Sequence, residues 1–108
     1  MKLPEIVCLC GSTKFLDKFD EYMLKFSLEG KIVLTLGTHK PIARQYADGL
    51  EGKKPILDEL HKRKIELADS IFVLNVGGYI GESTASEIQH AKLYGKKVTY
   101  LEEDNESK

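Results

Sequence analysis

Two glycine-bearing segments of this 108-residue chain each follow an apolar run and precede a helical pattern. The first contains Cys10, Gly11 and Ser12, with Lys14 two positions further on. Glycine lets a ligand approach the backbone closely, and the free amides at the start of a helix attract anions. Lys14 adds a mobile positive charge. The segment is thus a candidate site for a sugar or phosphate, and an ordinary capped turn is an equally good interpretation.

The second segment is richer in glycine, because Gly77, Gly78 and Gly81 fall within five positions. Three glycines exceed what a turn requires. The residues that follow open a helical pattern and carry two hydroxyls, which together with backbone amides can hold a phosphate or sugar oxygen. Capping of the helix by Ser83 or Thr84 is the alternative, and both roles can coexist. The predicted substrate-binding residues of the two segments are Cys10, Gly11, Ser12, Lys14, Gly78, Tyr79, Gly81, Glu82, Ser83 and Thr84.

Two further side chains, Glu87 and His61, are candidates for catalysis. Glu87 comes one helical turn after Ser83. The helix dipole near the N-terminus favours the carboxylate anion, which is the form that a nucleophile requires. His61 belongs to a largely apolar helical stripe, where it could exchange protons near neutral pH. Helical periodicity also permits a solvent-exposed Glu87 and a buried, structural His61.

The elements that position these residues begin with short apolar runs rich in β-branched side chains. Residues 5–10, 31–36 and 70–76 are continuous apolar runs, which are typical of strands buried on both faces, and residues 97–101 fit a fourth strand. Helical patterns fill the intervals: residues 15–26, with Ser12 or Thr13 as the cap and Gly30 as the stop, residues 55–68, and residues 82–94, with Gly95 as the stop.

This alternation predicts the fold class α/β: a single-domain Rossmann- or flavodoxin-like three-layer sandwich with a mostly parallel sheet of four to five strands. Right-handed crossovers bring the carboxyl ends of all strands to one edge, where such folds bind ligands. We expect the domain to span residues 1–101, and residues 102–108 to form a polar, frayed tail.

Three connections are expected at that edge of the sheet, at residues 11–14, 37–53 and 77–82. The middle connection is long, and loops of this length are often functional. His39, Arg44 and Tyr46 within it could close over a ligand, although an ordinary surface connection is equally compatible with its sequence.

Composition argues against several classes of function. Sixteen basic and seventeen acidic residues give a net charge of −1, which disfavours a broad electrostatic grip on a nucleic-acid polymer or a membrane. The chain has no long apolar run and no signal-peptide pattern, so we expect a cytoplasmic protein. Cys8 and Cys10 would face the same side of a strand, too far apart for easy disulfide closure. We interpret them as buried, reduced thiols with no histidine to complete a metal site, and expect neither a metal nor a cofactor.

Much of the chain resembles the nucleoside 2-deoxyribosyltransferase superfamily, which includes deoxynucleoside 5′-monophosphate N-glycosidases. The shared features are Ala68-Asp69 before a strand, a glycine-rich loop, a helix carrying Glu87 and Ala91, a following Gly95-Lys96-Lys97-Val98, and a first loop beginning Cys10-Gly11-Ser12. The resemblance implies that Glu87 attacks the anomeric carbon and forms a glycosyl-enzyme intermediate, while the departing base receives a proton.

The chain departs from the family pattern at several positions. His61 stands eight residues before Asp69, where the family has an aspartate, and Gln89 replaces a glycine two residues after Glu87. Glu82, Ser83 and Thr84 stand where members often carry aspartate and glycine. Histidine at position 61 could deliver a proton to a leaving base, but it supplies no second carboxylate.

Three functional hypotheses remain open at this stage. The leading one is hydrolysis of the N-glycosidic bond, or (deoxy)ribosyl transfer, on a nucleoside or nucleoside 5′-monophosphate, with Glu87 as nucleophile and His61 as acid/base or orienting group. The alternatives are a non-catalytic nucleotide-binding sensor on the same scaffold and a structural module. Because superfamily members commonly build pockets between subunits, we expect a homodimer or a larger homo-oligomer.

Overall fold

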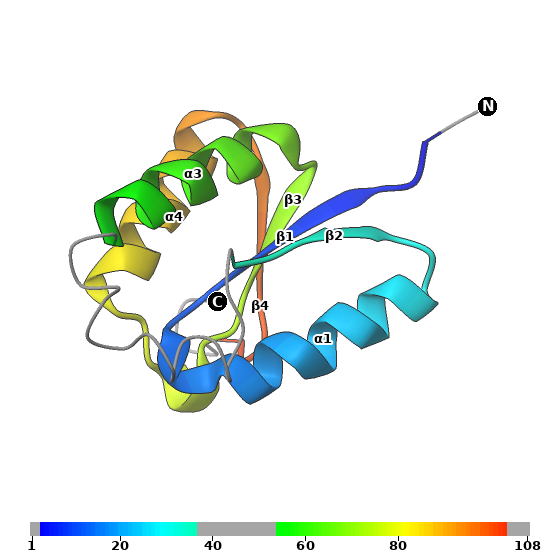
Figure 1. The fold of residues 1–108 in the computed structure, drawn as a ribbon, viewed down its shortest axis with the longest axis horizontal. Coiled ribbons are helices and arrows are strands. Elements are labelled where there is room, and N and C mark those ends of the chain that lie inside the picture. Colours follow the sequence, from blue (N-terminus) through cyan, green and yellow to red (C-terminus); the bar gives the residue numbers. More distant parts are fainter. Residues whose placement is uncertain (1–2, 37–53, 104–108) are drawn as a thin grey trace.

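The computed structural model describes residues 3–36 and 54–103 of the chain (Figure 1). The predicted middle connection, with His39, Arg44 and Tyr46, lies outside these described residues. Four strands, three α-helices and two 3-10 turns follow one another in the described ranges: β1 (Ile6–Cys10), η1 (Thr13–Phe15), α1 (Leu16–Leu28), β2 (Ile32–Leu34), α3 (Lys54–Leu67), β3 (Ser70–Val73), η3 (Val76–Gly78), α4 (Glu82–Leu93) and β4 (Lys97–Tyr100).

The four strands form one parallel sheet in the order β2-β1-β3-β4, which confirms the predicted fold class. In the register of the central pair, Val7 lies beside Ser70 and Cys10 lies beside Val73. The order reverses direction between β1 and β3, as in flavodoxin-like sheets, where ligands bind at the carboxyl ends of the strands beside this switch point. The loops after β1 and β3 therefore leave from the position at which a ligand site is expected.

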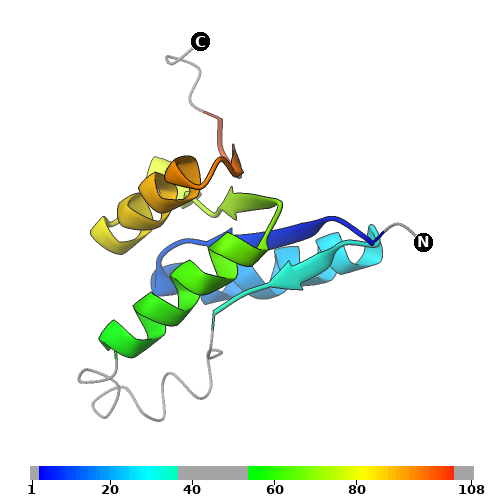
Figure 2. The ribbon, with the colours of Figure 1, turned by 90° about the horizontal axis from the view of Figure 1, so that it is seen from above.

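Helix α1 covers one face of the sheet, and helices α3 and α4 cover the other (Figures 1 and 2). Each face has its own apolar cluster, because strands buried on both sides direct alternate side chains to opposite helix layers. The buried cluster on the α1 side contains Val7, Leu9, Phe19, Phe26 and Leu74. The buried cluster on the α3 and α4 side contains Cys8, Cys10, Ile65, Ala68, Ile71, Val73, Ile88 and Ala91.

The ends of the helices follow local sequence signals. The Ser12 hydroxyl accepts a hydrogen bond from the Lys14 backbone N–H at 3.1 Å and caps the turn that leads into α1, as predicted. Gly30 follows the end of α1 with φ +87, a backbone conformation that glycine adopts at little cost. Pro55 lies in the first turn of α3, where its missing N–H removes no helical hydrogen bond. None of the helices within residues 3–36 and 54–103 has the length and apolar character needed to cross a membrane.

The first residue of the predicted tail is tied to the loop that follows β3. The Glu102 backbone N–H donates to Asn75 Oδ1, and Asn75 Nδ2 donates to the Glu102 carbonyl, both at 2.9 Å. The Glu102 carboxylate accepts a hydrogen bond from the Gly77 backbone N–H at 2.7 Å. Asn75 is buried, so this set of bonds, which we call the Glu102 clasp, is part of the folded domain. Residues 104–108 of the predicted tail lie outside the described residues.

Candidate active site

A cavity of about 250 Å³ lies between the second and third turns of α3 and the first two turns of α4. Both helices follow parallel strands, so their N-termini lie toward the edge formed by the carboxyl ends of the strands. The lining is polar and carries three carboxyl groups and one ammonium group. Its residues are Asp58, Lys62, Glu82, Ser83, Ser86 and Glu87. Three of these, Glu82, Ser83 and Glu87, are among the residues predicted from the sequence.

Glu87 is held at the wall of this cavity by the inner face of α4. The residue is only 7% exposed and shares the buried side of the helix with Thr84, Ile88 and Ala91. Burial raises the pKa of its carboxyl group above the usual 4.5, outweighing the opposing influence of His61 and of a hydrogen bond with Cys10. The helix dipole was expected to stabilise the Glu87 anion and so to lower its pKa, and this prediction is wrong. Glu87 lies beyond the first helical turn, where the dipole is weak and loss of water dominates.

Asp58 is a cavity residue that the sequence analysis missed. It lies three positions before His61 on α3, one helical turn nearer the sheet edge, and its negative charge contributes to the raised pKa of Glu87. Lys62 follows four positions later, so the two side chains share one side of the helix. No local sequence signal identifies Asp58, because its place in the cavity depends on how α3 packs beside α4. The structure therefore supplies a second carboxyl group near Glu87, although position 61 itself is histidine.

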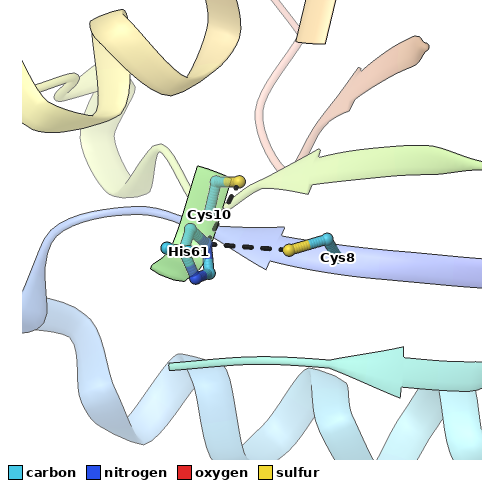
Figure 3. Close-up of side chains that lie close together, drawn as sticks. All are labelled: Cys8, Cys10 and His61. Carbon is cyan, nitrogen blue, oxygen red and sulfur yellow. Dashed lines mark hydrogen bonds between the residues drawn. The ribbon is translucent and has the colours of Figure 1, made fainter. Parts of the chain in front are cut away.

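His61 is turned toward the sheet and does not line the cavity. Its Nε2 atom lies 3.6 Å from the Cys8 sulfur and 3.6 Å from the Cys10 sulfur (Figure 3). Both cysteines are fully buried free thiols, as predicted, and His61 is 3% exposed. The expectation that no histidine joins them is wrong, because α3 packs across the face of β1 to which both thiols point. We call these three residues the thiol–imidazole cluster.

Hydrogen bonds within the thiol–imidazole cluster separate the acidities of the two thiols. A hydrogen bond from Cys10, assisted by His61, lowers the pKa of Cys8 to about 6, although burial opposes the change. The same bond and burial raise the pKa of Cys10. Burial lowers the pKa of His61, but its contacts with Cys8 outweigh burial and the net direction is upward. Glu87 bonds to Cys10, so this carboxyl group connects the buried cluster with the cavity.

The two glycine-bearing segments lie together at the sheet edge. The Lys14 Nζ atom stands 4.2 Å from the centroid of the Tyr79 ring, and Phe15 packs edge-on against the same ring. Gly11 is required by internal packing, since a Cβ there would lie 3.2 Å from both Cβ and the carbonyl oxygen of Leu74. The predicted ligand residues Cys10, Gly11, Ser12, Lys14, Gly78, Tyr79, Gly81 and Thr84 do not line the cavity around Glu87.

The backbone amides of the second glycine segment are bonded within the chain. Gly77 donates to the Glu102 carboxylate, Gly78 donates to the Asn75 carbonyl, and Tyr79 donates to the Val76 carbonyl. Helix α4 begins after Gly81, which occupies the N-cap position, so Ser83 and Thr84 lie within the first helical turn and not at the cap itself. The first turn of α4, beside the cavity, is thus a better candidate for contacting a ligand than the glycines themselves.

Comparisons with known proteins add no assignment to this geometry. No protein-family model matches the chain, and no curated protein is significantly similar to it in sequence. A functional proposal therefore depends on the cavity, on the groups that line it, and on the resemblance noted from the sequence.

Proposed function

We propose that the cavity between α3 and α4 binds the sugar of a nucleoside or nucleoside 5′-monophosphate, and that Glu87 cleaves the N-glycosidic bond by hydrolysis or transfer. The observation that carries this proposal is a buried carboxyl group, Glu87, at the wall of a polar cavity that also contains Asp58. Most enzymes that cleave a glycosidic bond use a pair of carboxyl groups at the anomeric carbon. One forms or stabilises the bond to the sugar, and the other manages a proton.

In the proposed reaction, a Glu87 oxygen bonds to the anomeric carbon as the bond from that carbon to the base breaks. The base leaves with the electron pair of that bond and takes up a proton. Asp58, on the facing helix, is the group that we propose to supply or relay this proton. Water or a second base then attacks the anomeric carbon and releases Glu87. His61, which does not line the cavity, acts as an orienting group through its influence on the charge of Glu87.

The size and charge of the cavity fit a sugar more closely than a whole nucleotide. A volume of about 250 Å³ lies below the range of roughly 300–1,000 Å³ that is usual for drug-sized ligands. A pentose would occupy it, and the base would extend toward the sheet edge. Ser83 and Ser86 offer hydroxyl groups to the sugar, and among residues 3–36 and 54–103 Lys62 is the cation lining the cavity that can meet a 5′-phosphate.

The proposal is tested by incubating the protein with a panel of nucleosides and nucleoside 5′-monophosphates and measuring free base by chromatography. Glu87→Gln should abolish base release, and Asp58→Asn should lower the rate by roughly 10²–10⁴-fold. Glu21→Gln, an exposed position on α1 across the sheet, is the matched control and should retain full activity. Unchanged activity in Glu87→Gln would refute the proposal.

The sensor alternative gives a different result in the same experiment. A nucleotide that raises the unfolding temperature but is recovered intact with the unaltered protein would favour binding without catalysis. We further propose that the protein is a homo-oligomer, which light scattering coupled to size-exclusion chromatography tests directly. A monomeric mass across the micromolar range would contradict this.

A further inference from the structure

The two thiols of the thiol–imidazole cluster take no part in the proposed reaction, and together with His61 they have the composition of a metal site. Its three potential ligand atoms, two sulfurs and one imidazole nitrogen, all lie within 4.8 Å of one another. Cys8 and Cys10 are fully buried and His61 is 3% exposed. Thiolate sulfur and imidazole nitrogen are the donors that Zn²⁺ prefers in proteins, whereas Mg²⁺ and Ca²⁺ select oxygen.

The two nitrogen-to-sulfur distances within the cluster match those around a tetrahedral zinc ion. Zn–S bonds of about 2.3 Å and Zn–N bonds of about 2.0–2.1 Å, meeting at a tetrahedral angle, place sulfur and nitrogen about 3.6 Å apart. The separations from His61 Nε2 to the two sulfurs are both 3.6 Å. Figure 3 shows the imidazole directed at both thiols from α3, while the thiols project from β1. The imidazole is therefore already placed for both sulfurs, and the two sulfurs lie within 4.8 Å of each other.

A second observation concerns the other nitrogen of the same ring. His61 Nδ1 is buried and has no hydrogen-bond partner among residues 3–36 and 54–103. An unpaired buried polar atom costs free energy in a structural histidine and in a metal ligand alike. A metal bond at Nε2 fixes the ring proton on Nδ1 and leaves that N–H unpaired, so the donor set and its spacing carry the metal site.

We propose that Cys8, Cys10 and His61 bind one Zn²⁺ ion beneath α3, a site that goes beyond the proposed glycosidic function. Binding displaces one proton from each thiol, and two thiolates with one Zn²⁺ and a neutral imidazole carry no net charge. Such a set is compatible with the apolar core around it, in which a single unpaired charge would be costly.

Cobalt substitution tests this proposal, because Cys8 and Cys10 are the only cysteines in the chain. Metal-free protein titrated with Co²⁺ should develop a sulfur-to-cobalt charge-transfer band that saturates at one ion per chain, and Zn²⁺ should abolish the band. Native mass spectrometry should show one Zn²⁺ bound with the loss of two protons. Absence of the band in the unaltered protein at saturating Co²⁺ would overturn the proposal.

Variants identify the ligands and separate this proposal from the glycosidic one. Cys8→Ser and Cys10→Ser should each lower the band intensity by about half, in proportion to the thiolates remaining, and His61→Gln should weaken Co²⁺ binding at least 10-fold. His90→Gln, a half-buried histidine bonded to Glu66, is the matched control and should bind as the unaltered protein does. Equal binding by the His61 and His90 variants would overturn the assignment of His61. A protein that binds Cu⁺ but neither Zn²⁺ nor Co²⁺ would overturn the choice of Zn²⁺.

The unaltered protein decides the outcome even if a cysteine variant fails to fold, because its band reports only on these two thiols. Failure of the two proposals is also distinguishable. Glu87→Gln should abolish base release and keep the cobalt band, whereas the cysteine variants should lower the band whether or not base is released. Loss of base release in Glu87→Gln with an intact band therefore supports the glycosidic proposal without bearing on the metal site. A protein with the band and no base release under any condition would refute the glycosidic proposal alone.

Discussion

The most informative single substitution is Glu87→Gln, because its effect on stability has a predicted sign and a predicted pH dependence. The folded structure raises the pKa of this carboxyl group above 4.5, chiefly by burial. Its contribution to stability is therefore fully present below its unfolded pKa and is lost as pH rises through the folded pKa. Above the unfolded pKa, the raised folded pKa of Glu87 opposes folding, and an uncharged amide of the same shape removes this penalty.

We expect the substitution to stabilise metal-free protein at pH 7.5 by about 0.5–2 kcal/mol, the usual gain when a functional residue is replaced by a structurally better one. For a domain of this size, each kcal/mol corresponds to roughly 4 °C in unfolding temperature. At pH 4 the gain should disappear, since the carboxyl group is then protonated in both states. Glu82→Gln is the matched control on the same helix. Glu82 is exposed in the first turn of α4, so its loss should destabilise by about 0.3–1 kcal/mol.

The assay is thermal unfolding followed by circular dichroism, with chelator present, across pH 4–8. The expected result is a difference curve for Glu87→Gln that rises with pH, while that for Glu82→Gln has the opposite sign. A Glu87→Gln protein that is less stable than the unaltered chain at pH 7.5 would refute the reasoning. It would mean that the carboxylate is stabilised by its neighbours more than burial disfavours it.

Three further predictions concern the scaffold that holds the site. Ile65→Ala should lower stability by about 2–5 kcal/mol in urea unfolding, because the side chain is fully buried, and a loss below 1 kcal/mol would contradict the packing described. Gly11→Ala should lower the free energy of unfolding by roughly 2–4 kcal/mol, since its Cβ would lie 3.2 Å from a backbone oxygen. Gly30→Ala has open space around the new Cβ and introduces only backbone strain, so it should lower the free energy of unfolding less, and equal losses would exclude the packing explanation. Asn75→Ala should cost about 1–3 kcal/mol and speed amide exchange at Glu102, and unchanged exchange would show that the clasp does not hold that residue.

The sheet and its helices could be predicted because their signals are local. Continuous β-branched runs identified β1, β2, β3 and β4, and the cap at Ser12 and the stop at Gly30 bounded α1. The bounds were less accurate. The run predicted as a strand over 70–76 pairs only at Ser70–Val73, because Leu74 continues the apolar pattern by packing on the α1 side after the strand has ended.

The candidate site could be predicted only in part, because it depends on how α3 lies across the sheet. Glu87 and Ser83 were found from their place in α4, which local periodicity fixes. Asp58 was missed because no sequence signal distinguishes one exposed helical turn from the next before the packing partner is known. The approach of His61 to Cys8 and Cys10 joins residues more than fifty positions apart, and only the crossover geometry brings them together.

The Glu102 clasp limits the binding of anions to the second glycine segment, because the Glu102 carboxylate already accepts a hydrogen bond from the Gly77 amide. Since this carboxylate is attached through β4 to the loop that it contacts, its effective concentration at Gly77 is on the order of millimolar or higher. A free phosphate must displace it before reaching that amide, so the loop discriminates against weak anions by internal competition. Shortening the chain to end before Glu102 would free only the Gly77 amide, because the Gly78 and Tyr79 amides would still donate to backbone carbonyls.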